Sequence, residues 1–259
     1  MIAPQVRFSD LKVIGTSAEH YQDRLRERYL EGGAKGQRPT SVGLVAHALV
    51  LNGARDVEVW HGKTRQGKAW DAFRAEHEGK VLVNVSEWDA ARAIAEAVER
   101  HPDAMAALDG ARERELPEWT IAGRKCGGRP DVIGRSFITD LKTAHTSSPA
   151  LFRGHSERMC YHAQLAWYLD GYAATGGKAK DAFIVAVEQR RPHVVTVFEL
   201  TPRALEVGRK IYSLWFEQLR VCEESDSWPG YAQSRVELDV ADGEELDLEY
   251  SDDEEEAAA

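Results

Sequence analysis

Alternating apolar and polar residues predict two adjacent strands near the middle of the chain, at 128–133 and 136–142. The residues between them are Gly134-Arg135, and a two-residue connection that contains Gly is typical of a tight hairpin. With this turn, Ile133 would face Ser136 across the pair. A loop of three residues would shift the pairing, so the register is an expectation.

The two strands carry acids and an amine on one face. Because successive side chains of a strand point to opposite faces, Asp131, Asp140 and Lys142 share a side. In the expected register the two aspartates lie on a cross-strand diagonal, with Cβ atoms about 7 Å apart. Two carboxylates at that separation can bind one divalent cation. The opposite face can pack on a core, since it is mostly apolar: Val132, Phe137, Thr139 and Leu141.

The first half of the chain is mainly helical in pattern. Thr16 followed by Glu19 predicts a capping box that opens a helix. Ser86 is expected to cap a second amphipathic helix. The helices predicted here are 16–30, 41–51, 67–78, 86–100 and 104–108, with a possible strand at 57–60 and a mobile basic loop at 31–39.

The second half alternates strands and helices. Strands are predicted at 113–121, 128–133, 136–142, 182–188 and 193–200, and helices at 158–173 and 202–222. This order predicts an α/β fold with one central mixed sheet flanked by helices. We expect a single domain over 1–240, made of a mostly helical part (1–110), an α/β core (111–223) and a C-terminal extension (224–240).

The net charge of −10 comes mainly from the C-terminal end. Residues 237–259 contain 12 of the 43 acidic residues and no Lys or Arg, which leaves 31 acidic against 33 basic residues in the remainder. Acidic overall charge therefore does not exclude a nucleic-acid partner. The segment 241–259 has few apolar residues and predicts a disordered tail.

The cysteines and the hydropathy argue against a disulfide-rich protein, a four-cysteine metal protein and a membrane-spanning protein. Three cysteines, Cys126, Cys160 and Cys222, form neither a disulfide framework nor a four-cysteine metal site. No apolar run reaches the roughly 20 residues that cross a bilayer. The first residues lack the pattern of a signal peptide, so a cytoplasmic protein without membrane contact is expected.

Other residues could take part in chemistry. Gln164 and Tyr168 are four apart and share a helical face, although such residues often lie at the rim of an amphipathic helix. His47 lies in an apolar helix, where a single His is usually a core residue. Glu115 is a third possible carboxylate on the strand entering the sheet, and Glu113 has the same strand parity.

Taken together, these segments resemble the PD-(D/E)xK nuclease superfamily, and within it the RecE-type (exonuclease VIII-like) exonucleases of phages and prophages. The resemblance extends from about Phe8 to Tyr231. The motifs that carry it are Gly128-Arg-Pro-Asp131, Asp140-Leu-Lys142-Thr143, Tyr161-His-Ala-Gln164-Leu-Ala-Trp-Tyr168, Ala46-His47 and Trp228-Pro-Gly-Tyr231. It implies a restriction-endonuclease-like core.

The resemblance also implies roles for residues. Metal ligands would be His47, Glu115, Asp131, Asp140 and the main-chain carbonyl of Leu141, with Asp131 and Asp140 also catalytic. Lys142 would position and activate the attacking water, and Gln164 and Tyr168 would match the family's Gln-x-x-x-Tyr pattern beside the site. The cofactor would be Mg²⁺, with Mn²⁺ expected to substitute, and no iron–sulfur cluster.

The activity implied is degradation of one strand of linear double-stranded DNA from its end, 5′ to 3′, which exposes single strand for phage-type recombination. The partners implied are a RecT-like single-strand annealing protein and further copies of the chain in a ring. Other PD-(D/E)xK specificities stay open, among them CRISPR-associated or AddB-like single-strand exonucleases and endonucleases. A non-catalytic module that binds DNA or an annealing protein is the remaining alternative.

Overall fold

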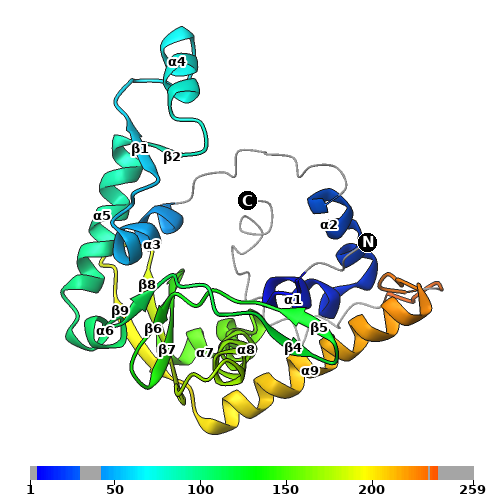
Figure 1. The fold of residues 1–259 in the computed structure, drawn as a ribbon. Coiled ribbons are helices and arrows are strands. Elements are labelled where there is room, and N and C mark those ends of the chain that lie inside the picture. The colour runs from blue at the N-terminus through cyan, green and yellow to red at the C-terminus, as the bar shows by residue number, and fades with distance from the viewer. Residues whose placement is uncertain (1–4, 30–41, 233, 239–259) are drawn as a thin grey trace.

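The computed structural model describes residues 5–29, 42–232 and 234–238. Its centre is a five-stranded sheet in the order β3–β6–β7–β8–β9 (Figure 1). Only the β7–β8 pair is parallel within this sheet. The strands are β3 (Ala111–Arg112), β6 (Val132–Ile133), β7 (Phe137–Ala144), β8 (Asp181–Glu188) and β9 (Val195–Glu199). The α/β fold with a central mixed sheet is therefore confirmed.

Helices cover both faces of the sheet, because alternate residues of its central strands are apolar on both sides. In β8, Val185 and Val187 join one buried cluster, whereas Ile184 and Ala186 join the other. The first cluster is completed by α3 (Val42–Asn52), α5 (Val85–Glu99) and α6 (Pro102–Ala107). The second is completed by α1 (Phe8–Thr16), α2 (Ala18–Tyr29), α7 (Pro149–Arg158), α8 (Tyr161–Ala174) and α9 (Pro202–Ser225).

Two predicted helix starts are wrong by one or two residues. Thr16 ends α1 instead of capping α2, and the Ser17 hydroxyl accepts the His20 backbone N–H at 3.4 Å in its place. Asn84, not Ser86, caps α5: its side chain accepts from Glu87 N–H while the Glu87 carboxylate accepts from Asn84 N–H. In both cases a neighbouring side chain makes the same kind of capping bond.

The segment 113–121 is not one strand, as the sequence predicted. Its end forms a separate two-stranded hairpin of β4 (Trp119–Ile121) and β5 (Arg124–Cys126). Trp119 is buried against Trp167 of α8, at 5.1 Å between ring centroids. Packing of this indole on α8 takes the chain away from the central sheet.

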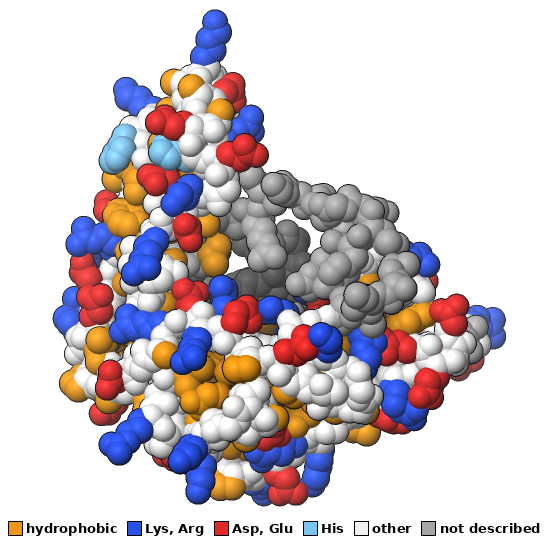
Figure 2. Space-filling model, viewed as in Figure 1, with side chains coloured by type: hydrophobic (Ala, Val, Ile, Leu, Met, Phe, Trp, Pro, Cys, Tyr) orange, Lys and Arg blue, Asp and Glu red, His pale blue; other side chains and the backbone are white. Residues whose placement is uncertain are grey.

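A small arm projects from the α5 side of the sheet (Figure 1). It consists of two parallel strands, β1 (Val57–Trp60) and β2 (Val81–Asn84), joined through α4 (Lys68–Glu76). None of the α4 residues is buried, and Trp60, Trp70 and Phe73 pack on one another. On the face in Figure 2, basic and acidic side chains are interspersed over the described residues.

No helix among the described residues combines the length and the apolar character that a membrane span requires. The predicted basic loop at 31–39 and the predicted disordered tail at 241–259 lie outside the described residues. The division of the chain into domain parts stays a prediction.

Close packing of α8 on α9 depends on a glycine. A Cβ at Gly208 would lie 2.3 Å from the His162 carbonyl oxygen, so Gly208→Ala must push the helices apart. We expect a loss of about 1–3 kcal/mol in the free energy of unfolding. Gly154→Ala in α7 is the matched control, because no atom lies within 4 Å of its Cβ position. This change should stabilise by up to about 1 kcal/mol. Urea unfolding followed by circular dichroism measures both, and equal effects would contradict the packing argument.

Candidate functional site

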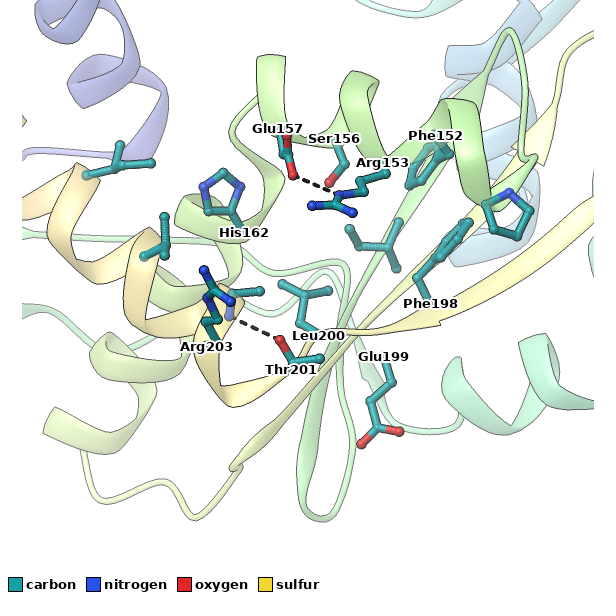
Figure 3. A pocket seen from close by; sticks show the side chains of 15 residues that line it. Phe152, Arg153, Ser156, Glu157, His162, Phe198, Glu199, Leu200, Thr201 and Arg203 are labelled. Carbon is teal, nitrogen blue, oxygen red and sulfur yellow. Dashed lines mark hydrogen bonds and ion pairs between the residues drawn. The ribbon is translucent and has the colours of Figure 1, made fainter.

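Two cavities lie beside α8, and their chemistry differs. The larger, about 770 Å³, lies among α7, β9 and the start of α9, and its wall includes the stacked rings of Phe152 and Phe198 (Figure 3). Its charged lining is superficial, since Arg153 pairs with Glu157 at the surface. The smaller, about 410 Å³, is lined by Lys142, whose ammonium pairs with the predicted Asp140. The smaller cavity is the candidate site.

The β6–β7 turn lies one residue later than the sequence predicted. The ladder pairs Ile133 with Ile138, and Gly134 N–H donates to the Phe137 carbonyl at 2.9 Å. The tip is therefore Arg135-Ser136. The predicted register was wrong because the glycine serves another purpose: a Cβ at Gly134 would lie 2.3 Å from the Phe137 ring.

A turn that moves by one residue shifts the register by two, so the faces do not change. Asp131, Asp140 and Lys142 thus keep the common side that the sequence predicted. Continued by one residue, the observed ladder sets Asp131 directly opposite Asp140 instead of on a diagonal. Directly opposed Cβ atoms are about 4.5–5.5 Å apart, closer than predicted.

Pro130 ends the ladder at this point. In the observed register it would oppose Leu141, and because proline has no N–H, it cannot donate to the Leu141 carbonyl. The Leu141 N–H, which would donate to the Pro130 carbonyl in a continued ladder, donates instead to the Asp131 carboxylate, at 2.7 Å from Oδ2. Because a strand residue directs its N–H and C=O to the same side, the Leu141 carbonyl also faces the end of β6. The sequence Pro130-Asp131 therefore leaves a main-chain oxygen beside the two carboxylates.

His47 reaches the same carboxylate from α3. Its Nε2 lies 3.0 Å from Asp131 Oδ2, and both side chains are partly buried. Burial lowers the pKa of His47, but the hydrogen bond and the charge of Asp131 outweigh it and leave that pKa raised. Burial likewise raises the pKa of Asp131, and His47 and Lys142 outweigh it, so this pKa is lowered. The two form an ion pair favoured in the charged state.

Asp140 and Lys142 form the second pair. Asp140 is buried, and its Oδ2 lies 2.6 Å from the Lys142 ammonium. Burial raises the pKa of Asp140 to about 6, in part offset by Lys142. Burial lowers the pKa of Lys142, but the charges of Asp140 and Asp131 outweigh it, so Lys142 stays protonated. The Lys142 Nζ also lies 4.8 Å from the centroid of the Tyr161 ring, a cation–π contact.

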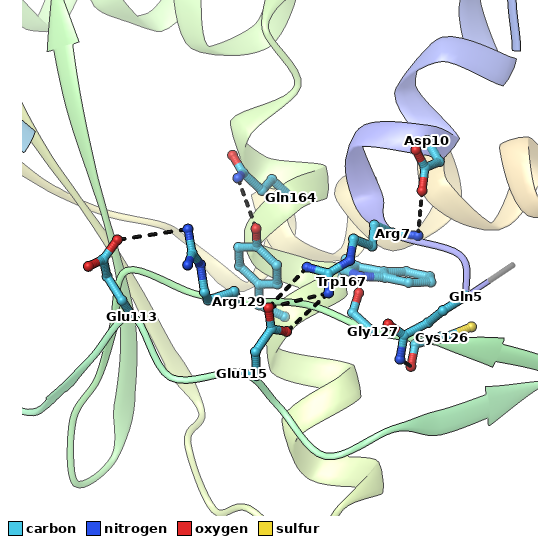
Figure 4. Close-up of polar contacts among 11 residues, drawn as sticks. Gln5, Arg7, Asp10, Glu113, Glu115, Cys126, Gly127, Arg129, Gln164 and Trp167 are labelled. Carbon is cyan, nitrogen blue, oxygen red and sulfur yellow. Dashed lines mark hydrogen bonds and ion pairs between the residues drawn. The ribbon is translucent and has the colours of Figure 1, made fainter. Parts of the chain in front are cut away.

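Gln164 and Tyr168 lie on the α8 side of the cavity. The Gln164 amide donates to the Tyr168 hydroxyl at 3.2 Å, so the two predicted residues act as a pair (Figure 4). Burial and the charge of Asp140 raise the pKa of Tyr168 to about 12. Tyr168 therefore stays a neutral hydroxyl that can donate a hydrogen bond.

The two candidate glutamates separate in the structure. Glu115 is 54% exposed, and both of its carboxylate oxygens contact the Arg7 guanidinium (Figure 4). Glu113 follows β3, and its N–H donates to the Asp131 carbonyl at 2.8 Å. The Glu113 carboxylate accepts from Asn52 Nδ2 at 2.6 Å. Glu113 is thus the acid that lies opposite Asp131 where β3 pairs with β6.

Sequence reasoning missed two of the three cations that complete the cavity wall. Arg7 and Lys12 come from the start of the chain and α1, and Arg129 precedes the Pro-Asp pair. Arg129 was recognisable from its place beside the motif. Arg7 and Lys12 were not, because only the packing of α1 against α9 brings them to this cavity.

The donors suit a hard divalent cation, although they are not arranged around one. Among the described residues, no group of three or more His, Cys, Asp or Glu side chains is positioned to hold an ion. The two aspartates are instead neutralised by His47 and Lys142. The same group nevertheless brings together the Asp131 and Asp140 carboxylates and the His47 imidazole, with the Leu141 main chain bonded to Asp131. Such a ligand set fits Mg²⁺ or Mn²⁺.

Residues 7–236 match a family model described as a PDDEXK-like domain of unknown function (DUF3799). Among curated proteins there is no match. A putative exonuclease from Eubacterium rectale is similar in structure, with a TM-score of 0.55 at 14% identity over 95% of this chain and 93% of that one.

Two other solved structures match less closely. A phage-related exonuclease from Haemophilus somnus has a TM-score of 0.38 at 11% identity, over 86% of this chain and 97% of that one. An alkaline exonuclease from Laribacter hongkongensis has a TM-score of 0.33 at 16% identity, over 62% and 85%. PDDEXK nucleases generally use divalent metals.

The ion pair of His47 predicts a pH dependence of stability in EDTA. A histidine whose pKa is raised in the folded state stabilises that state fully below its unfolded-state pKa, about 6.5. This stabilisation is lost as the pH rises through the folded-state pKa. The melting temperature of His47→Gln should therefore fall below wild type at pH 6, and the difference should shrink towards pH 9.

His162→Gln is the control of opposite sign. Burial lowers the pKa of His162, so its contribution to the stability of the folded state is present at high pH and is lost as the pH falls. Thermal unfolding of the three proteins between pH 5 and 9 measures both trends. A pH-independent difference for His47→Gln would mean that His47 is only a packed core residue.

Proposed function

The chain belongs to the PDDEXK-like family whose model spans residues 7–236, and from this premise we propose that it is a metal-dependent deoxyribonuclease that degrades linear duplex DNA from its ends. One observation carries the proposal. Two opposed aspartates, a protonated lysine and a histidine lie together at the end of a strand ladder, beside a cavity with a cationic wall. Structural pairs of charges are common, but a buried carboxylate with a raised pKa in a cleft is typical of a functional site.

We assign metal binding to Asp131, Asp140, His47 and the carbonyl of Leu141. When bound, Mg²⁺ would polarise the scissile phosphate and lower the pKa of a coordinated water. Asp140 must be deprotonated to take part. Its pKa of about 6 means that this form dominates only above that pH.

Lys142 has the role of a fixed cation. With its raised pKa it cannot accept a proton at neutral pH, so it would donate hydrogen bonds to the attacking water or to a phosphate oxygen. Its contact with the Tyr161 ring holds the ammonium at the cavity. Tyr168 and Gln164 supply neutral donors on the opposite wall, where they would orient the phosphate.

The cavity wall supports recognition of a strand end. Arg7, Lys12 and Arg129 can contact phosphates, which carry most of the affinity of DNA-binding proteins. Glu115 orients the Arg7 guanidinium through its two oxygens. A volume of about 410 Å³ is within the usual range for a small ligand, so the cavity would enclose nucleotides at an end and not a duplex.

The finer parts of the activity rest on the resemblance to RecE-type exonucleases. These are 5′ to 3′ polarity, Mg²⁺ as the natural metal, a ring of several copies, a RecT-like partner and a role in phage-type recombination. Each stays a prediction. An endonuclease and a module that only binds DNA are the alternative outcomes of the test below.

Asp140→Asn and Lys142→Ala should each lower the rate of nucleotide release from linear duplex DNA with Mg²⁺ by about 100-fold or more, because each removes a charge that acts at the transition state. Lys142→Ala should keep binding of DNA ends within a few-fold. EDTA should abolish release by the wild type.

Lys178→Ala, an exposed change outside the cavity, is the control and should keep full activity. Covalently closed circular DNA should be resistant, and comparison of 5′-phosphorylated with 5′-hydroxyl ends tests polarity. Cleavage of circles would indicate an endonuclease. DNA retention without products would indicate a binding module.

The third acid can be assigned by two matched substitutions. Sequence predicted Glu115, whereas its contact with Arg7 and the place of Glu113 beside Asp131 lead us to propose Glu113. Glu113→Gln should raise the Mg²⁺ concentration needed for half-maximal activity by about tenfold, as loss of a supporting group does at metal sites. Glu115→Gln should instead weaken DNA binding with little change in the Mg²⁺ requirement. The reverse pattern would restore the original assignment.

A further inference from the structure

The arm formed by β1, α4 and β2 carries a row of aromatic rings. Trp60 of β1 contacts Trp70 and Phe73 of α4, at 5.5 and 5.1 Å between ring centroids. Phe73 in turn contacts His77 at 4.4 Å. All four side chains stay half-exposed, although a helix as short as α4 depends on packing for its stability. An exposed apolar cluster on a projecting element is typical of an interaction surface.

The loop between the two tryptophans is cationic. Residues 59–70 contain Lys63, Arg65 and Lys68 and no Asp or Glu. Both lysines are exposed, and neither pairs with an acid within the part of the chain that the structure describes. Figure 2 shows basic side chains that stand out from the tip of this arm. The chemistry of the loop therefore favours a partner that carries negative charge.

The loop is held against the rings. The Trp60 indole N–H donates to the Thr64 carbonyl at 3.0 Å. The Arg65 guanidinium lies 5.9 Å from the centroid of the Trp70 ring and pairs with Glu87 of α5. These contacts fix cations and aromatic faces next to one another before any partner binds.

The acids of the arm do not neutralise the two lysines. Of the four acids in residues 57–84, Glu58 lies 4.0 Å from the His77 ring and Asp71 lies 3.6 Å from Arg74. The remaining two lie at 76–78, at the end of α4 and in the turn that follows it. The lysines are thus available to an anion from outside.

We propose that this arm is a second DNA-binding site, separate from the cavity, and that it holds single-stranded DNA. Bases would stack on the half-exposed rings of Trp60, Trp70 and Phe73, and Lys63 and Lys68 would contact the phosphates. Proteins that bind single strands without sequence preference combine aromatic platforms with cations in this way. The bases of a duplex are already stacked on both sides, so the rings select a single strand.

The arm extends from the helix that serves the candidate site. Strand β1 begins at Val57, shortly after α3 ends at Asn52. The Asn52 amide donates to Glu113 at 2.6 Å, and His47 of the same helix contacts Asp131. The arm would therefore hold the strand that degradation exposes. This role rests on the proposed function, whereas the binding of single-stranded DNA does not.

Anisotropy of a fluorescently labelled oligothymidylate, titrated with the full chain in EDTA, tests the binding without cleavage. Lys63→Gln/Lys68→Gln should weaken it about fivefold or more and lower the slope of log affinity against log salt by about 1.4, since each phosphate contact on a single strand contributes about 0.7. Lys178→Gln/Lys180→Gln is the matched control. It removes two exposed lysines outside the arm and should change neither quantity.

Substitutions of Trp70 separate stacking from packing of the arm. Trp70→Leu keeps an apolar side chain but has no aromatic face, so it should weaken oligothymidylate binding about fivefold or more. Trp70→Phe keeps an aromatic face and should stay within about twofold of wild type. Both variants should bind covalently closed circular duplex as wild type does.

The outcomes distinguish this inference from the proposed function. A chain that releases no nucleotides but shows these binding effects would refute the nuclease and support the arm. An active nuclease whose arm variants bind oligothymidylate as wild type does would overturn the inference. Arm variants that change the sedimentation of the DNA-free chain, with unchanged oligothymidylate affinity, would identify a contact between copies and overturn it as well.

Discussion

The site depends on the point where the β6–β7 ladder stops. Pro130 has no N–H to donate to the Leu141 carbonyl, and the Leu141 N–H donates to the Asp131 carboxylate in place of the Pro130 carbonyl. This one bond fixes the Asp131 side chain across from Asp140 and leaves the Leu141 carbonyl facing the same space. Because β7 is also bonded to β8 over its full length, the position of these groups is held by the centre of the sheet and not by a loop.

Burial of four ionisable side chains at this point requires that they neutralise one another. Neighbouring carboxylates repel one another where water is scarce, and here His47 and Lys142 supply the compensating charges. The compensation is incomplete at Asp140, whose pKa is raised to about 6. A divalent cation would relieve this remaining cost, so the same burial that destabilises the isolated carboxylate favours metal binding.

Helix α9 helps to place part of the cavity wall. Its inner side packs on α8 and on α1, which brings Lys12 and the adjoining Arg7 to the cavity beside Lys142.

The sequence by itself determined which residues share a face. Strand periodicity is two, and an error of two in register does not change which side Asp131, Asp140 and Lys142 occupy; helical periodicity likewise paired Gln164 with Tyr168. What depended on contacts between distant segments was decided only by the tertiary structure. Packing of Phe137 over Gly134 moved the turn. Packing of Trp119 on α8 took residues 119–121 out of the central sheet, with Glu115 in the segment leading to that hairpin. The local pattern favoured a core position for His47, and only the family resemblance placed it at the site. Docking of α3 makes it a partner of Asp131, because a local pattern does not specify which helix will lie across a strand end.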